Sequence, residues 1–213
     1  MKSATVHVID DDELVRTALS RLLRMAGYEV RDYASAGAFL LEPAPAAPGC
    51  LLLDVRMPGP SGLELQDALA RRAGSLPIVF MSGHGDIAMS VRAVKAGAVD
   101  FLTKPVDREL LFTAVAGAIE RSATRQQAID DAHAARSRYA TLTPREQEVL
   151  AEVAAGRLSK QIAADLGTAE RTIKAHRSRI MEKMNVASLL ELGKLIEVLR
   201  AAGELPDSRA DER

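Results

Sequence analysis

The chain has 213 residues, enough for one large domain or two small ones, and its net charge of -1 conceals any local asymmetry. Apolar residues make up 47%, which suffices for hydrophobic cores, while 3% aromatic content without tryptophan argues against an aromatic-rich binding surface. The single cysteine, Cys50, cannot form an internal disulfide and suits a reducing compartment. With no signal-peptide pattern and no apolar run near membrane-spanning length, we expect a soluble, cytoplasmic protein with no membrane partner.

Strand and helix patterns alternate through residues 1–121. Apolar or β-branched runs predict strands at 5–9, 28–33, 50–54, 77–81 and 99–103. Helical spacing follows each strand, from 13 to a stop at Gly27, through 39–41, and over 62–72, 86–95 and 107–121. The first helix is expected to bury the stripe Leu14, Ala18, Leu22 and Met25. Five such alternations imply an α/β domain with a doubly wound, five-stranded parallel sheet.

The remaining residues have helical patterns only. Residues 122–140 are rich in Ala, Gln, Arg and Asp, which predicts a helical or flexible linker without a core of its own. Thr143, Pro144 and Glu146 form a capping-box pattern, so a helix begins there. From that point to about residue 200, four helices are separated by Gly156, Gly167 and Asn185. We therefore expect an α/β domain at 1–121, a linker at 122–140, a separate all-α four-helix domain at 141–203, and a charged, disordered tail at 204–213.

Polar residues follow four of the five predicted strands. The third strand runs through four apolar residues to Asp54, and Pro58 and Gly59 then force a loop. In parallel sheets, functional side chains gather in the crevice outside the carboxyl ends of the strands. We therefore expect the polar residues at these strand ends to lie close together: Asp10, Asp11, Asp54, Ser82 and Lys104. Each acid alone could be a helix cap and the lysine a surface residue. Together, three converging carboxylates call for a divalent cation, and hard oxygen ligands favour Mg²⁺.

This constellation resembles the site of CheY-like receiver domains of two-component response regulators. The runs at 81–86 and 96–101 resemble the FixJ branch in particular. The resemblance implies that Asp54 accepts a phosphoryl group from a sensor histidine kinase. It also implies that Mg²⁺ is held by Asp11, Asp54 and the backbone carbonyl of Arg56, with help from Asp10.

The same resemblance implies a switch. Lys104 is expected to pair with a phosphoryl oxygen and to precede a cis bond to Pro105, while Ser82 moves toward the phosphoryl group and Phe101 rotates inward. Receivers of this type often form homodimers on phosphorylation through the fourth helix and fifth strand, here 86–95 and 99–103. Local charge would thus bias a two-state element.

The pattern of residues 159–184 is that of a helix-turn-helix. A short helix, a turn at Gly167 and a helix with the inward stripe Ile173, Ile180 and Met184 are predicted. Residues 160–183 contain six Lys/Arg and three Asp/Glu, a net charge of +3 that suits a phosphate backbone. The polar and basic residues of the second helix lie largely off the inward stripe and are candidates for DNA binding: Arg171, Lys174, Arg177, Ser178 and Arg179.

The segments 142–146, 160–163 and 172–177 resemble the LuxR-type DNA-binding domain, and its pairing with a receiver is typical of the NarL/FixJ family. This resemblance implies that Lys174, Ala175 and Ser178 face the bases. It also implies phosphate contacts by Lys160, Thr172, Arg177 and Arg179. The leading hypothesis is a phosphorylation-activated regulator, not an enzyme, that dimerises on double-stranded promoter DNA, with RNA polymerase as a further candidate partner. One alternative is a phosphorylation-independent regulator whose receiver serves only dimerisation. An aspartyl-phosphate phosphotransferase is disfavoured, because Arg56 stands where such enzymes carry a second acid and no phosphate-binding Gly-rich loop is present.

Overall fold

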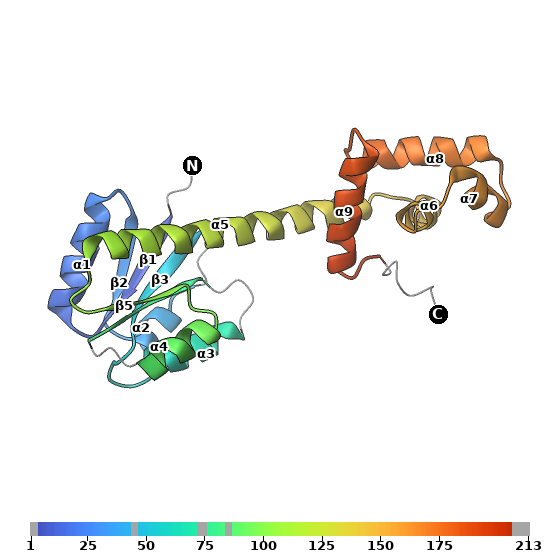
Figure 1. The fold of residues 1–213 in the computed structure, drawn as a ribbon. Helices are drawn as coiled ribbons and strands as arrows, with labels where there is room; N and C mark the ends of the chain where they lie inside the picture. The colour runs from blue at the N-terminus through green and yellow to red at the C-terminus, as the bar shows by residue number, and fades with distance from the viewer. Residues whose placement is uncertain (1–3, 44–46, 72–75, 84–86, 206–213) are drawn as a thin grey trace. The chain divides into compact units, whose positions relative to one another are not determined.

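A computed structural model describes residues 4–43, 47–71, 76–83 and 87–205 (Figure 1). The predicted end of a helix at Arg72, the predicted start of another at Asp86, and residues 206–213 of the predicted tail lie outside these ranges. The chain forms two compact units, residues 1–126 and 127–213. Within the described ranges, no helix is both long and apolar enough to cross a membrane.

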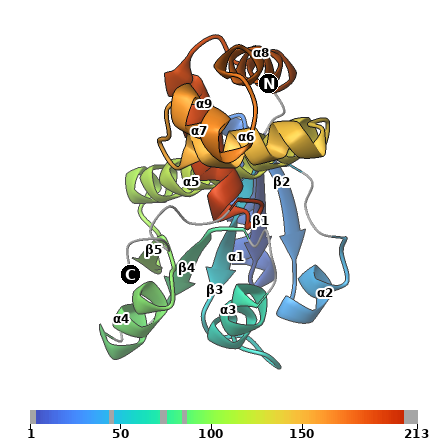
Figure 2. The same ribbon diagram turned by 90° about the vertical axis from the view of Figure 1, so that its right-hand side faces the viewer.

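The first unit contains a five-stranded parallel sheet in the order β2-β1-β3-β4-β5, which Figure 2 shows edge to edge. Its strands are β1 Thr5–Ile9, β2 Glu29–Tyr33, β3 Gly49–Asp54, β4 Ile78–Ser82 and β5 Asp100–Thr103. Its helices are α1 Glu13–Met25, α2 Ala36–Leu40, α3 Gly62–Ala70, α4 Ile87–Lys95 and the first part of α5 Arg108–Tyr139. Helices α1 and α5 cover one face of the sheet and α2, α3 and α4 cover the other (Figure 1). The predicted doubly wound fold is therefore confirmed.

Both faces of the sheet are buried, which explains the continuous apolar runs of its central strands. Leu51 and Leu53 of β3 face the layer of α2, α3 and α4, while Leu52 faces α1 and α5. Cys50 lies on the same side of the sheet as Leu52, facing α1 and α5, and is fully buried. This burial raises the pKa of its thiol to about 12. Cys50 is thus a core residue, as its position in an apolar strand predicts.

The buried face of α1 differs from the expected one. Leu14 and Met25 are 82% and 77% exposed, whereas Leu19 and Leu23 are buried against the sheet. The prediction of a buried stripe through Leu14 and Met25 was wrong. The helix carries two apolar stripes, and the packing against the sheet selects the one that includes Leu23.

Helix α5 is continuous from Arg108 to Tyr139, so the predicted last receiver helix and the predicted linker are one helix. Its first part packs on the sheet through Leu111 and Val115, and Ala135 near its end belongs to the core of the second unit. The boundary between the two compact units falls at Gln126, within this helix.

The second unit is helical throughout its described residues. After the end of α5 it contains α6 Pro144–Ala154, α7 Ser159–Asp165, α8 Glu170–Lys183 and α9 Leu189–Ala201, which confirms the four predicted helices. The capping box of Thr143 and Glu146 is formed. The hydrogen bond from Lys183 at 2.6 Å, followed by that from the Thr143 backbone, lowers the pKa of Glu146 to about 2.

The core of the second unit includes the predicted inward stripe of α8. Ile173, Ile180 and Met184 are at most 1% exposed. Two residues assigned to the tail also join this unit: Glu204 forms an ion pair with Arg136 of α5, and Leu205 is buried in the core.

Candidate functional site

Sheet register brings the predicted acidic residues together at the carboxyl edge of the sheet. Ile9 pairs with Leu53, so Asp10 and Asp54 follow at the ends of neighbouring strands. On the other side of β3, Asp54 pairs with Met81 of β4, which ends at Ser82. The peptide N–H of Lys104 donates to the carbonyl of Ser82 at 2.7 Å, which anchors the loop after β5 beside this edge.

Lys104 lies between two buried carboxylates. Its Nζ is 2.6 Å from Oδ2 of Asp10 and 2.7 Å from Oδ1 of Asp54. Asp54 is buried at the end of a fully buried strand, and its second oxygen, Oδ2, accepts the backbone N–H of Arg56 at 2.9 Å. One ammonium group thus separates two carboxylates that would otherwise repel each other.

The protonation of this cluster reflects its burial. Burial is the largest influence on Asp54 and raises its pKa, an effect that Lys104 partly offsets and the neighbouring charge of Asp10 reinforces. Burial acts to lower the pKa of Lys104, but its hydrogen bonds to Asp10 and Asp54 outweigh that effect and the pKa is raised. The raised pKa of Lys104 favours its protonated, cationic form, and the raised pKa of Asp54 makes its carboxylate more basic than that of an exposed aspartate.

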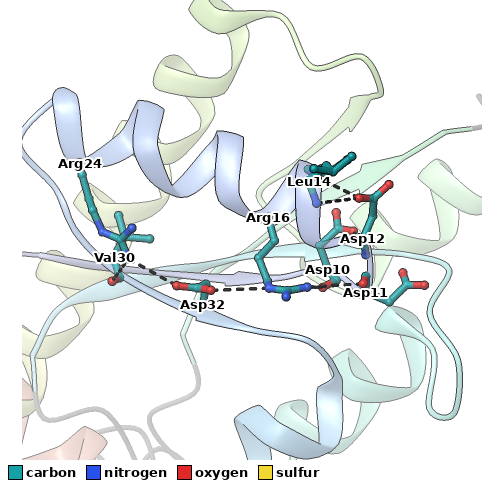
Figure 3. A network of polar contacts seen from close by, with 9 residues as sticks. Asp10, Asp11, Asp12, Leu14, Arg16, Arg24, Val30 and Asp32 are labelled. Atoms are coloured by element: carbon teal, nitrogen blue, oxygen red, sulfur yellow. Dashed lines mark hydrogen bonds and ion pairs between the residues drawn. The ribbon is translucent and has the colours of Figure 1, made fainter.

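The side chain of Asp11 lies outside the contacts that join Asp10, Asp54 and Lys104. Its side chain is exposed and points away from Arg16 (Figure 3), and no group of three or more His, Cys, Asp or Glu side chains able to hold a metal occurs within the described residues. The next residue, Asp12, caps α1 by accepting the N–H groups of Leu14 and Val15. Asp11 is thus the exposed carboxylate at the rim of the site.

Arg16 is a component of the site that sequence reasoning missed. Its Nη1 donates to the backbone carbonyls of Asp10 at 2.8 Å and Asp11 at 3.4 Å, and its Nε is 3.6 Å from Oδ2 of Asp32 (Figure 3). A signal existed in the sequence: a cation near the amino end of a helix opposes the helix dipole and calls for a nearby anionic or carbonyl partner.

The predicted switch residues lie around the same edge. Ser82 is buried at the end of β4, and Phe101 of β5 is half-buried with its ring centroid 6.3 Å from that of Phe80. The Lys104–Pro105 peptide bond is cis, as expected. The structure therefore brings Asp10, Asp54, Ser82 and Lys104 together and places Phe101 one strand away.

Helices α7 and α8 form the predicted helix-turn-helix, with Gly167 in the left-handed conformation between them at φ 61°. Most candidate DNA-binding side chains are exposed: Lys160, Arg171, Lys174, Ala175, Ser178 and Arg179. Thr172 and Arg177 are half-buried, and Arg177 donates to the Ser159 hydroxyl at 3.1 Å. Lys174 forms an ion pair with Glu170 at 2.8 Å, while Arg171 and Arg179 add two further exposed cations to α8.

A parallel sheet with acidic strand ends and a helix-turn-helix unit define a two-domain regulatory protein. Residues 6–116 match the response regulator receiver domain, and residues 140–195 match the bacterial regulatory proteins of the luxR family. The chain belongs to the response regulators that combine these two domains. It is a phosphorylation-activated transcriptional regulator of a two-component system, a class whose partners are a sensor kinase and DNA.

Relatives match nearly the whole chain. Nodulation protein W of Bradyrhizobium diazoefficiens is 46% identical, covering 92% of this chain and 86% of that protein. The transcriptional regulatory protein FixJ of Azorhizobium caulinodans is 43% identical, covering 91% and 92%. The solved structure of the response regulator StyR is 47% identical with a TM-score of 0.80, covering 92% of this chain and 98% of that one.

Proposed function

We propose that Asp54 is the phosphoacceptor of this regulator. The observation that carries the proposal is the contact of Lys104 with both Asp54 and Asp10 at the carboxyl edge of the sheet, at 2.7 and 2.6 Å. A carboxylate can attack phosphorus and form an acyl phosphate. An oxygen of Asp54 forms the new bond to phosphorus as the bond to the donor breaks, and Lys104 pairs with an equatorial oxygen of the transferred group.

The donors around Asp54 fit a magnesium ion. The carboxylates of Asp10, Asp11 and Asp54 and the backbone carbonyl of Arg56 are hard oxygen ligands of the kind Mg²⁺ binds. The side chain of Asp11 is exposed and its carboxylate makes no hydrogen bond or ion pair with the described residues, so this carboxylate is available. When bound, Mg²⁺ neutralises charge on the phosphoryl oxygens. Asp11 and Asp10 orient and hold the ion, and the Arg56 N–H keeps Asp54 Oδ2 in place.

Phosphorylation changes the surface formed by α4 and β5. Ser82 turns its hydroxyl toward the phosphoryl group, and Phe101 rotates toward the space vacated. The exposed apolar residues Ile87, Val91 and Val94 on α4 then form part of a homodimer contact. A dimer presents two α8 helices, one to each half of an inverted repeat in promoter DNA, with RNA polymerase as a further partner.

In the DNA complex the exposed face of α8 enters the major groove. Lys174, Ala175 and Ser178 face base edges, while Lys160, Arg171, Thr172 and Arg179 contact phosphates. Arg177, which is half-buried, contacts phosphate only from the edge of this face. Lys174 exchanges its ion pair with Glu170 for the contact with DNA.

The test compares wild type with Asp54→Asn, an amide of the same shape. Each is incubated with Mg²⁺ and acetyl phosphate, and the mass of the intact chain and its size-exclusion profile are recorded. We expect a gain of one phosphoryl group and dimerisation in wild type only. Phosphoryl gain by Asp54→Asn would place the nucleophile elsewhere, and dimerisation without phosphoryl gain would support a phosphorylation-independent regulator.

A further inference from the structure

Arg16 has an unusual position for a cation on a surface helix. Its side chain is only 14% exposed and turns toward the loop after β1 instead of toward solvent. Asp32 of β2 faces the other side of the same guanidinium, and Arg24 approaches Asp32 at 3.4 Å while also donating to the carbonyl of Val30 (Figure 3). Arg16 is thus linked on one side to Asp32 of β2 and on the other side to the backbone carbonyls of the loop after β1.

The other acceptor atoms of Asp10 are fixed separately. Its Oδ1 accepts the backbone N–H of Asp12 at 3.0 Å, and its Oδ2 accepts from Lys104. The carboxylate of Asp11 has no partner among the described residues, so its direction depends on the backbone that carries it. Arg16 holds this backbone through the carbonyls of both Asp10 and Asp11.

We propose that Arg16 is a positioning residue for the magnesium site, and that Asp32 orients its guanidinium. Arg16 keeps the peptide between Asp10 and Asp11 in the orientation that directs the Asp11 carboxylate to the metal. Partners that orient a metal ligand without touching the metal contribute strongly to affinity. This inference rests on the proposed function of the site.

A merely structural role for Arg16 leads to a different expectation. If Arg16 only tied α1 to β2, its loss would lower stability and leave the affinity of the folded chain for Mg²⁺ unchanged. Arg21 offers a matched control, because its side chain is exposed on the same helix and makes no hydrogen bond or ion pair with the described residues.

The test measures Mg²⁺ binding to the full, unphosphorylated chain by isothermal titration calorimetry. The variants are Arg16→Gln, Asp32→Asn and the control Arg21→Gln. We expect the dissociation constant to rise at least about tenfold for Arg16→Gln and less for Asp32→Asn, with no change for Arg21→Gln. Arg16→Lys should recover part of the affinity, since one ammonium can donate to a carbonyl but cannot also engage Asp32 edge-on.

A second measurement separates metal binding from the reaction. The rate of phosphoryl incorporation from acetyl phosphate should recover in Arg16→Gln as Mg²⁺ is raised to saturation. An Arg16→Gln chain that folds and binds Mg²⁺ within about twofold of wild type overturns the inference. If Arg16→Gln does not fold, Asp32→Asn decides by the same criterion. Wild type that binds no Mg²⁺ would instead overturn the proposed function as well.

Discussion

At the scale of single residues, His7 is a buried histidine on β1 that the proposed function does not use. It is 4% exposed, its Nδ1 lies 3.1 Å from the Tyr33 hydroxyl, and its ring stacks on Tyr33 and meets the edge of Phe39. Burial, and after it the charge of Arg31, lowers the pKa of His7 to about 4. The folded receiver therefore keeps this ring neutral.

The depressed pKa makes stability pH-dependent. Above pH 6.5 the ring is neutral in both states, and as pH falls toward 4 only the unfolded chain takes up the proton, so stability is lost. We expect the contribution of His7 to lower the free energy of unfolding by about 2 kcal/mol when the pH is lowered from 7 to 5. Urea unfolding of wild type and His7→Phe at both pH values checks this, because other titrating groups cancel. An equal pH dependence in the two chains would contradict it.

Gly62 at the start of α3 is required by the close approach of β3. A Cβ there would lie 2.4 Å from the carbonyl oxygen of Asp54 and 3.1 Å from the ring of Phe80. Gly62→Ala should cost about 1–3 kcal/mol of unfolding free energy and slow phosphorylation, since it pushes against the strand end that carries Asp54. Gly117→Ala in α5 is the control, because its Cβ meets nothing within 4 Å.

Thermal and urea unfolding measure both glycine variants. Gly117→Ala should gain about 0.5–1 kcal/mol from helix propensity. Similar stabilities for the two variants would mean that the contact between α3 and β3 relaxes without cost.

At the scale of elements, the sequence predicts best where packing leaves one solution. Strands buried on both faces must be apolar throughout, so β1, β3 and β4 were recognisable, and parallel pairing then places Asp10, Asp54, Ser82 and Lys104 at one edge. The contact of Arg16 with backbone carbonyls was not predictable, because it depends on how α1 is rotated against the sheet. The unbroken α5 was equally hidden: residues 122–139 are good helix formers, but composition alone does not exclude a flexible linker.

The rotation of α1 supplies a test at this scale. Leu14 and Leu23 are nine residues apart, hence about 180° around the helix, and only Leu23 is buried. Leu23→Ala should cost about 2–5 kcal/mol of unfolding free energy, whereas Leu14→Ala should cost less than about 0.5 kcal/mol. Urea denaturation of both variants gives the comparison. A larger loss of unfolding free energy for Leu14→Ala than for Leu23→Ala would mean that α1 packs on the sheet through the face that includes Leu14.

At the scale of the whole molecule, phosphorylation of the first unit must change how the second unit binds DNA. The net charge of -1 hides a basic recognition helix, so binding should depend on the local phosphate contacts of α8 and respond to salt. If phosphorylation produces a dimer, two recognition helices engage one duplex and the number of released counterions doubles. The salt dependence of binding therefore reports the assembly on DNA without knowledge of the operator.

We expect acetyl phosphate and Mg²⁺ to steepen the plot of log affinity against log salt for duplex DNA in wild type and to leave Asp54→Asn unchanged. Each phosphate contact contributes a slope of about -0.9. Arg179→Ala removes one exposed cation from α8, so it should lower the steepness by about one contact in the monomer and about two in the phosphorylated dimer. Fluorescence anisotropy at several salt concentrations measures these slopes. If the loss for Arg179→Ala were the same with and without phosphorylation, the chain would bind DNA as the same species in both states, and activation would have to act through a partner of the bound regulator instead of through dimerisation.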